Sequence, residues 1–156
     1  MSNKTQKLHV GIFSITDNKS ALSFRGLIAL DQPYSKALFW VGISPFDGNI
    51  VKQTMGFSSI ELKRLIAALI DCYANGTPYT KYSGGKRSSK NKLKIFIPSS
   101  TSDSIVLQLG SGYEMLSFTL ERDMVIPLTE EIDLLIKTTN MACYKHQQKM
   151  IQNVFS

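Results

Sequence analysis

The sequence predicts an α+β fold in which two strand-strand-strand-strand-helix repeats form two antiparallel sheets packed on a helical core. Two observations predict it. Four strand-like segments precede each of two segments with helical spacing of apolar residues, and no linker between the halves is long or polar enough to separate them. A chain of 156 residues, 43% of them hydrophobic, can bury one core. We therefore predict a flexible N-terminus at 1–8, a single domain at 9–150 with repeats at about 9–76 and 77–150, and a C-terminal tail at 151–156.

The first repeat consists of four strand-like segments and one helix. Turn residues such as Asp17-Asn18 and Asp47-Gly48 separate the strands. The strands are predicted at residues 9–15, 21–30, 36–43 and 50–57. Ser58 followed by Glu61 matches a capping box, so a helix is predicted to begin at Ser58 and to end at Asn75-Gly76.

The second repeat follows the same order. Its strands are predicted at residues 79–82, 92–97, 104–109 and 113–120. Residues 124–127 are predicted to be a short extended segment that leads into the last helix. Thr129 is the predicted N-cap of the last helix. Glu130 and Glu131 would then lie in the first helical turn, where negative charge interacts favourably with the helix dipole.

The positive charge is concentrated in one segment. Between Asp71 and Asp103 there are six cations and no acid, which accounts for the whole net charge of +6. These cations are Lys81, Lys86, Arg87, Lys90, Lys92 and Lys94. Such a field suits a polyanion such as nucleic acid, and the alternative is a solvated Ser/Gly-rich loop that maintains solubility. Residues 80–90 do not form a phosphate-binding loop, because Arg87 stands where the Walker pattern requires Ser or Thr.

The segment 92–97 separates cations and an aromatic ring from aliphatic side chains. Period-2 alternation places Leu93, Ile95 and Ile97 on one face and Lys92, Lys94 and Phe96 on the other. Single-stranded nucleic acid needs this combination, since ammonium groups follow the phosphates while aromatic rings stack on bases. The alternative is that Phe96 covers core at a sheet edge and the lysines protect that edge.

Two further strands carry candidate contacts. Alternation in 36–43 places Lys36 and Trp40 on one face, so Trp40 is either a stacking platform or a core residue. Arg25 lies in an otherwise apolar strand, where an exposed cation costs little and a buried unpaired one costs several kcal/mol. Arg25 is therefore a candidate phosphate contact.

No catalytic, metal or cofactor site is predicted, and we do not expect an enzyme. His9 and His146 lie next to no nucleophile motif, and the acids are dispersed. Cys72 and Cys143 fall within helical patterns and are expected to be buried thiols. Because the chain has neither a secretory-signal pattern nor a run near 18 apolar residues, we expect an intracellular protein that does not enter a membrane.

Three strings, in this order along the chain, resemble the Whirly family of single-stranded DNA-binding proteins. Residues 18–23 (NKSALS) resemble the family's K-G-K-A-A-L-S, residues 53–62 (QTMGFSSIEL) its Q-V-F-S-L-S-V-T-E-I, and residues 125–131 (VIPLTEE) its I-P-I-T-K-A-E. The resemblance implies two four-stranded sheets packed across two helices, tetramers formed through the helical core, and binding of single strands between sheets with little sequence preference. The sequence departs from the family at Asp17 and Asn18, which stand where the string has Lys-Gly.

Together these observations predict a protein that binds single-stranded DNA and protects or remodels exposed strands in replication, recombination or repair. The predicted phosphate contacts are Lys19, Arg25, Lys36, Lys81, Lys86, Arg87, Lys92 and Lys94, and the predicted stacking residues are Trp40, Tyr82 and Phe96. An RNA-binding protein of the same fold and a protein–protein adaptor domain are the alternatives. We expect a homo-oligomer, with a tetramer favoured. A cytoplasmic or nucleoid location in a bacterial, phage or plasmid setting is expected, or an organelle if a leader was removed.

Overall fold

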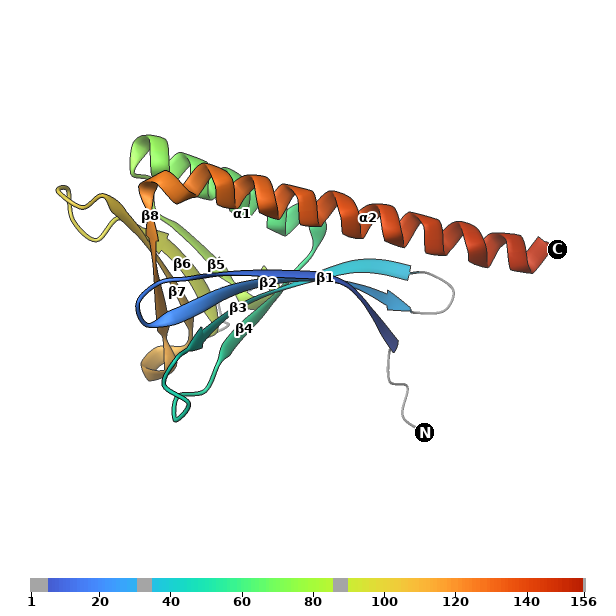
Figure 1. The fold of residues 1–156 in the computed structure, drawn as a ribbon, viewed down its shortest axis with the longest axis horizontal. Helices are drawn as coiled ribbons and strands as arrows, with labels where there is room; N and C mark the ends of the chain where they lie inside the picture. The colour runs from blue at the N-terminus through green and yellow to red at the C-terminus, as the bar shows by residue number, and fades with distance from the viewer. Residues whose placement is uncertain (1–5, 31–34, 86–89, 156) are drawn as a thin grey trace.

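The computed structural model describes residues 6–30, 35–85 and 90–155 and confirms the predicted α+β architecture of two antiparallel sheets and two helices (Figure 1). The first sheet has the order β1-β2-β3-β4, and the second has the order β5-β6-β7-β8. The strands are β1 (Gln6–Thr16), β2 (Ser20–Leu30), β3 (Ser35–Pro45), β4 (Gln53–Phe57), β5 (Tyr79–Tyr82), β6 (Lys92–Phe96), β7 (Ser104–Gly110) and β8 (Leu116–Glu121). The helices are α1 (Ser59–Asn75) and α2 (Val125–Phe155), with short 3₁₀ turns at η1 (Ser83–Gly85), η2 (Gly112–Glu114) and η3 (Arg122–Met124).

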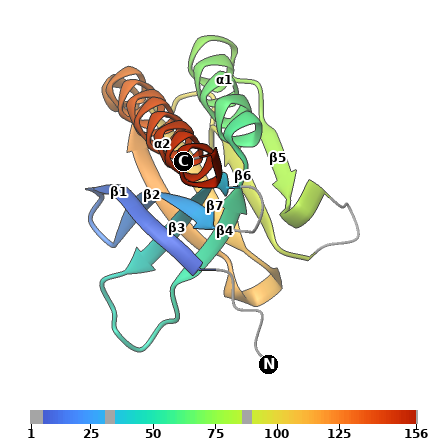
Figure 2. The same cartoon turned by 90° about the vertical axis from the view of Figure 1, so that its right-hand side faces the viewer.

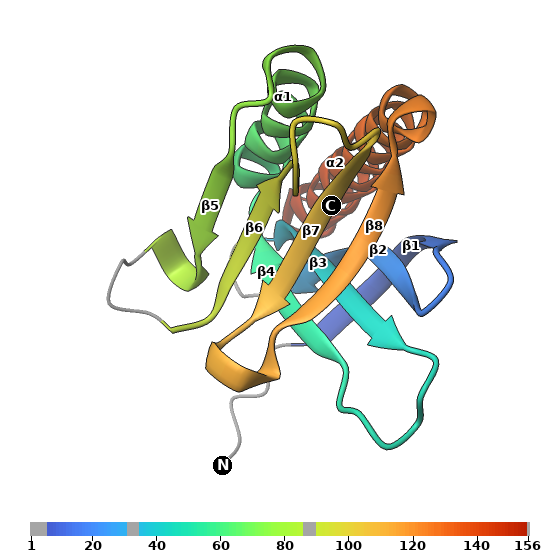
Figure 3. The same ribbon diagram turned by 90° about the vertical axis from the view of Figure 1, so that its left-hand side faces the viewer.

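The two helices lie side by side on the same side of the first sheet (Figure 2). α2 runs along β1, β2 and β3, while the second sheet lies in front of the first, with its strands crossing those behind (Figure 3). Inward-facing side chains of both sheets and both helices form one core cluster, which includes Phe24, Phe57, Leu65, Phe118 and Ile132. Both sheets therefore turn one face to the core and leave the other to solvent.

The predicted capping box at the start of α1 is present. Ser58 is the N-cap, its hydroxyl accepts a hydrogen bond from the Glu61 backbone, and the Glu61 carboxylate accepts one from the Ser58 backbone. Gly76 ends the helix in the left-handed conformation, with φ of 72°.

The start of α2 was predicted incorrectly. The helix begins at Val125, so residues 125–127 are helical instead of extended, and Thr129 is inside the helix. Pro127 is tolerated because the first-turn N–H groups of a helix have no intrahelical acceptor. The Thr129 hydroxyl donates to the Ile126 carbonyl at 2.8 Å instead of capping, and the first turn contains no acid. The predicted dipole contact of Glu130 and Glu131 is therefore also wrong.

Other element boundaries differ by a few residues. β1 begins at Gln6, three residues before the expected start, and α2 continues through residues 151–155, which were expected to be a tail. β4 and β8 begin later than expected, at Gln53 and Leu116, because Ile50 lies in the preceding loop and Tyr113 in the 3₁₀ turn η2. These two predicted strands were too long because the apolar side chains of Ile50 and Tyr113 were assigned to strands instead of to the loops before them.

The two sheets are joined at the β1–β2 turn by Asp17. One of its carboxylate oxygens accepts hydrogen bonds from the Lys19 and Ser20 backbone, both at 2.7 Å. The other accepts one from the Thr119 backbone N–H of β8 at 2.8 Å. Burial alone would raise the pKa of Asp17, but these hydrogen bonds outweigh it and the pKa lies below the ordinary 3.8. Asp17 thus occupies an edge of β8 that would otherwise be open.

Candidate nucleic-acid interface

The outer face of the first sheet, which is the face turned away from α2 and the core, carries cations and one indole. Because paired residues on adjacent antiparallel strands share a face, the register defines its composition. Its rows are Lys7-Ala29-Lys36, His9-Leu27-Leu38, Ile12-Arg25-Trp40-Gly56 and Ser14-Ser23-Gly42-Thr54. Arg25 and Lys36 are exposed and Trp40 is half-buried, as the alternation in these strands predicts for an outward-facing set. The structure therefore brings three of the predicted site residues together here.

A shallow trough of about 430 Å³ crosses this face around Trp40. Its lining combines three cations, the indole, two hydroxyl side chains and apolar groups, without a carboxylate. The cations are Lys7, Arg25 and Lys52. Lys7 Nζ lies over the Trp40 ring, 5.4 Å from its centroid.

Glycines shape the trough. A Cβ atom built at Gly42 would lie 3.1 Å from Lys52 Cε, and one built at Gly56 would lie 3.6 Å from Trp40 Cζ3. The Lys52 chain and the Trp40 ring therefore occupy space that side chains at these positions would take. This arrangement keeps the cation and the ring close to the sheet surface.

Sequence reasoning missed Lys7 and Lys52. Lys7 was placed in the N-terminal segment expected to be flexible. Strict alternation counted back from Ile12 and Ser14 would also have turned it inward, and it is the bulge between His9 and Gly11 that shifts the register so that His9 and Lys7 lie on the outer face. Lys52 fell within the strand expected at 50–57, where alternation would place it on the face of Thr54 and Gly56. In the structure it lies before β4, and the tertiary structure shows that its side chain lies over Gly42.

The outer face of the second sheet collects the other predicted cations and rings. Tyr82 pairs with Lys92 across β5 and β6, and Lys94 lies on the same face two residues further along. Phe96 follows on that face, and all four side chains are half-buried. Leu93 and Ile95 are fully buried beneath them, as the alternation predicts. The site residues of this sheet are thus one contiguous outward-facing group.

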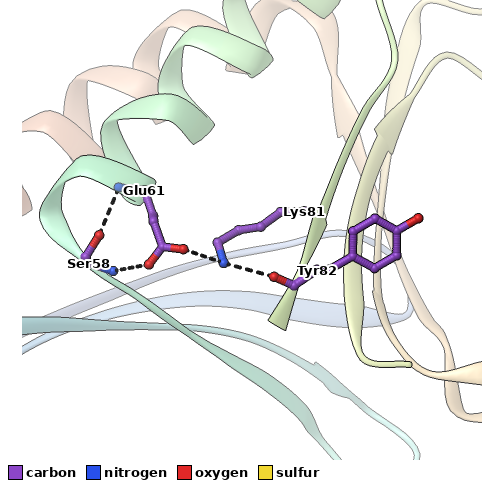
Figure 4. Close-up of polar contacts among 4 residues, drawn as sticks. All are labelled: Ser58, Glu61, Lys81 and Tyr82. Carbon is purple, nitrogen blue, oxygen red and sulfur yellow. Dashed lines mark hydrogen bonds and ion pairs between the residues drawn. The ribbon is translucent and has the colours of Figure 1, made fainter. Parts of the chain in front are cut away.

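Lys81 does not belong to this group and corrects a prediction. Its side chain is 6% exposed, and its ammonium forms an ion pair with Glu61 at 2.8 Å. The same ammonium lies 4.8 Å from the centre of the Phe57 ring and donates to the Tyr82 carbonyl at 3.3 Å. In Figure 4 the Lys81 chain points towards Glu61 at the start of α1, while the Tyr82 ring points away from it. Lys81 is therefore unsuited to contact a phosphate chain and instead joins β5 to α1.

The remaining predicted contacts lie elsewhere. Lys19 is exposed at the β1–β2 turn, where a hollow of about 520 Å³ next to β8 also contains the carboxylates of Asp17 and Glu121. The acids make this hollow less attractive to phosphate than either outer face. Lys86 and Arg87 lie outside the described residues.

Acids are almost excluded from the sheets. Along the described strands, the first sheet contains no Asp or Glu and the second contains only Glu121, at the end of β8. Helices and loops carry most of the other acids, including Glu61, Glu130, Glu131 and Asp133. The outer faces of the sheets are therefore the electropositive part of the described structure, whereas the helices are of mixed charge.

The described residues offer neither a metal site nor a membrane-spanning helix. They contain no group of three or more His, Cys, Asp or Glu side chains placed to hold a metal ion. None of the helices within them has the length and apolar character needed to cross a membrane.

Comparisons with known proteins connect this geometry to one fold. No protein-family model matches the chain, and no curated protein matches it in sequence. Among solved structures, the crystal structure of WHY1 from Arabidopsis thaliana is similar, with a TM-score of 0.52 and 15% sequence identity, over 83% of this chain and 90% of that chain. The similarity supports a Whirly-like fold for this chain, as the three sequence strings implied.

Proposed function

We propose that this protein binds single-stranded DNA through the outer faces of its two sheets, largely without sequence preference. The observation that carries the proposal is the composition of these faces: cations and aromatic rings, with hardly a carboxylate. Ammonium and guanidinium groups attract phosphates irrespective of sequence, and aromatic rings stack on any unpaired base. The Whirly-like fold supports the same function.

The partial burial of the aromatic side chains on the outer faces is the physical reason to favour single strands over duplex. Trp40, Tyr82 and Phe96 are half-buried, so a base must leave its stack to reach the face of one of these rings. Bases paired in a duplex present their edges in the grooves, whereas single strands can present their faces. In a cell, such binding would serve to protect or remodel exposed strands during replication, recombination or repair.

A fluorescence-anisotropy titration tests the proposal. A labelled DNA strand of about 30 nucleotides is titrated at several salt concentrations and competed with duplex DNA and with RNA of the same sequence. If six outward cations engage phosphates, log affinity falls with log salt with a slope of about −4, from about −0.7 per contact. A slope near zero, or equal competition by the duplex, would refute the proposal. Preferential competition by RNA would redirect it to an RNA-binding protein.

A triple substitution separates this function from that of an adaptor domain. Replacing Lys92, Lys94 and Phe96 with Ala removes two cations and a ring from one face while leaving the buried Leu93 and Ile95 in place. We expect more than a tenfold loss of affinity for single-stranded DNA with the fold retained. The matched control is Lys63→Ala, which removes an exposed cation from α1. Unchanged affinity in the triple variant would favour the adaptor function.

We further propose that the protein is a homo-oligomer, with a tetramer favoured. Helix α2 carries exposed apolar side chains along its length. Among them are Leu134, Met141 and Tyr144, with exposed fractions of 59%, 55% and 58%. Contiguous exposed apolar surface is a feature of interfaces between chains. Light scattering coupled to size exclusion measures the mass, and a tetramer corresponds to four chains of 17.4 kDa. Met141→Glu with Tyr144→Glu should lower that mass, and a monomeric native protein would contradict the proposal.

A further inference from the structure

Trp40 is placed so that one small group controls access to its ring. The indole lies across the outer face of β3 next to Gly56, where the missing side chain leaves room for its six-membered ring. Over the ring lies the ammonium of Lys7, which comes from the start of the edge strand β1. In the free protein, the position where a flat ligand would stack is therefore occupied by a cation.

Lys7 is held there weakly. Within the described part of the chain, the ion pairs are Lys81–Glu61 and Lys137–Asp133, so the Lys7 ammonium has no carboxylate partner. Its side chain is exposed, and its contact with the ring is a cation–π contact at an exposed site. Such a contact is weaker than the stacking of a nucleobase on an aromatic ring.

The rest of the trough complements a nucleotide. Arg25 lies directly opposite Trp40 in the register, and Lys52 lies over Gly42 at the other end. The Ser23 and Thr54 hydroxyl groups line the space between them, and the lining includes no carboxylate to repel a phosphate. A base stacked on Trp40 would thus have cations on several sides for its flanking phosphates.

We propose that the Trp40 trough is a single-nucleotide subsite in which an unpaired base replaces the Lys7 ammonium on the indole, and the released ammonium then pairs with a flanking phosphate. The exchange makes Lys7 a cover in the free state and a phosphate contact in the bound state. This inference rests on the proposed single-strand binding and assigns one of its subsites. It requires a base and a phosphate on the same ligand, so a bare phosphate chain does not trigger it.

Trp40 is the only tryptophan, so its fluorescence reports on this subsite alone. Oligothymidylate of about 30 nucleotides and an abasic deoxyribose-phosphate oligomer of the same length are titrated into the full chain, with anisotropy and tryptophan emission recorded in parallel. Oligothymidylate should quench Trp40 strongly, whereas the abasic oligomer should bind more weakly and leave the emission nearly unchanged. Binding by anisotropy without quenching would overturn the subsite while the proposed function stands. Absence of any binding would overturn both.

Variants of the two residues test the exchange. Lys7→Ala should make Trp40 in the free protein more accessible to the neutral quencher acrylamide and should make the salt slope shallower by about 0.7, while oligothymidylate still quenches the ring. Lys63→Ala should change neither the accessibility of Trp40 nor the salt slope and serves as the control. An unchanged slope in Lys7→Ala would overturn the transfer of the ammonium to phosphate.

Substitution of the ring itself provides an independent readout. Trp40→Phe keeps an aromatic face and should retain most of the affinity, whereas Trp40→Leu should lose about tenfold, within the range of one stacked base. Circular dichroism checks that both variants are folded. Equal affinities of folded Trp40→Phe and Trp40→Leu would show that no base stacks at this position.

Discussion

Replacement of Lys81 by Met tests whether this lysine is a structural residue. Methionine fills nearly the same volume and can keep the contact with the Phe57 ring, but it removes the ion pair with Glu61. The sequence alone placed Lys81 among the phosphate contacts, whereas its side chain is 6% exposed. The variant should therefore reduce the stability of the protein and not its affinity for nucleic acid.

The expected loss in the free energy of unfolding depends on which of the two charges is left without a partner. Removing one member of a buried ion pair costs about 3–5 kcal/mol when the remaining charge stays buried. In Lys81→Met the remaining charge is Glu61, whose side chain is 31% exposed and can be rehydrated, and it keeps its hydrogen bond from the Ser58 backbone. We expect a loss of about 2 kcal/mol in the free energy of unfolding. Glu61→Gln leaves the more deeply buried ammonium instead and should cost more, about 3 kcal/mol.

The effect of pH provides a second check. Burial alone would raise the pKa of Glu61, but hydrogen bonds from Lys81 and Ser58 outweigh it and hold the pKa below the ordinary 4.5. A carboxylate with a lowered folded-state pKa stabilises the protein fully above its ordinary pKa, and this contribution is lost as the pH falls through the folded value. The difference between the native protein and Lys81→Met should therefore be complete at pH 7 and shrink below about pH 4.5.

Urea unfolding followed by Trp40 fluorescence, at one protein concentration and at pH 7 and 4, measures these differences. Anisotropy with single-stranded DNA is measured on the same samples, with Lys92→Met as the matched variant on the outer face. A loss below about 0.5 kcal/mol at pH 7, or a reversed order of Lys81→Met and Glu61→Gln, would refute the electrostatic reasoning. A loss of DNA affinity in Lys81→Met equal to that in Lys92→Met would refute the structural assignment of Lys81.

Three further predictions concern the core and the junction between the sheets. A Cβ atom at Gly26 would overlap with Thr139 Oγ1 of α2, so Gly26→Ala should cost about 2 kcal/mol in the free energy of unfolding measured with urea. Adding Thr139→Ala to this variant should recover part of that loss. Gly48→Ala is the control and should change the stability little, because a Cβ atom there meets open space. Asp17→Asn should cost about 1–2 kcal/mol at pH 7 because it weakens four hydrogen bonds to the carboxylate, three from backbone N–H groups and one from the Ser20 hydroxyl. Its difference from the native protein should shrink as the pH falls below 3.8, and an equal loss in the exposed Asp103→Asn would contradict this. Burial raises the thiol pKa of Cys72 and Cys143, so both should resist a thiol reagent at pH 8 until urea unfolds the protein, and prompt reaction of either would show that its site opens.

Local patterns were sufficient for most elements and for the faces of the strands. The capping box at Ser58 and Glu61 and the stop at Gly76 depend on a few adjacent residues, so they could be identified without any tertiary information. The alternation in β3 and β6 likewise depends only on which side chains avoid water. The start of α2 was missed because Pro127 and Thr129 resemble an extended approach and a cap, whereas packing of Val125 in the core extends the helix towards the N-terminus.

Local sequence patterns predict the α+β class, the order of two sheet-and-helix repeats and which residues share a strand face with Trp40 and with Phe96, because period and capping depend on adjacent residues. Whether Trp40 and Phe96 face solvent or core depends on how the sheets pack. Packing between distant segments determines which of the basic residues remain exposed to a ligand. Lys81 is buried and paired with Glu61, whereas Lys7 and Lys52 approach Trp40 from separate segments of the chain. Ion pairs and troughs depend on distances between residues far apart in the chain, and these distances exist only once the sheets have paired and packed.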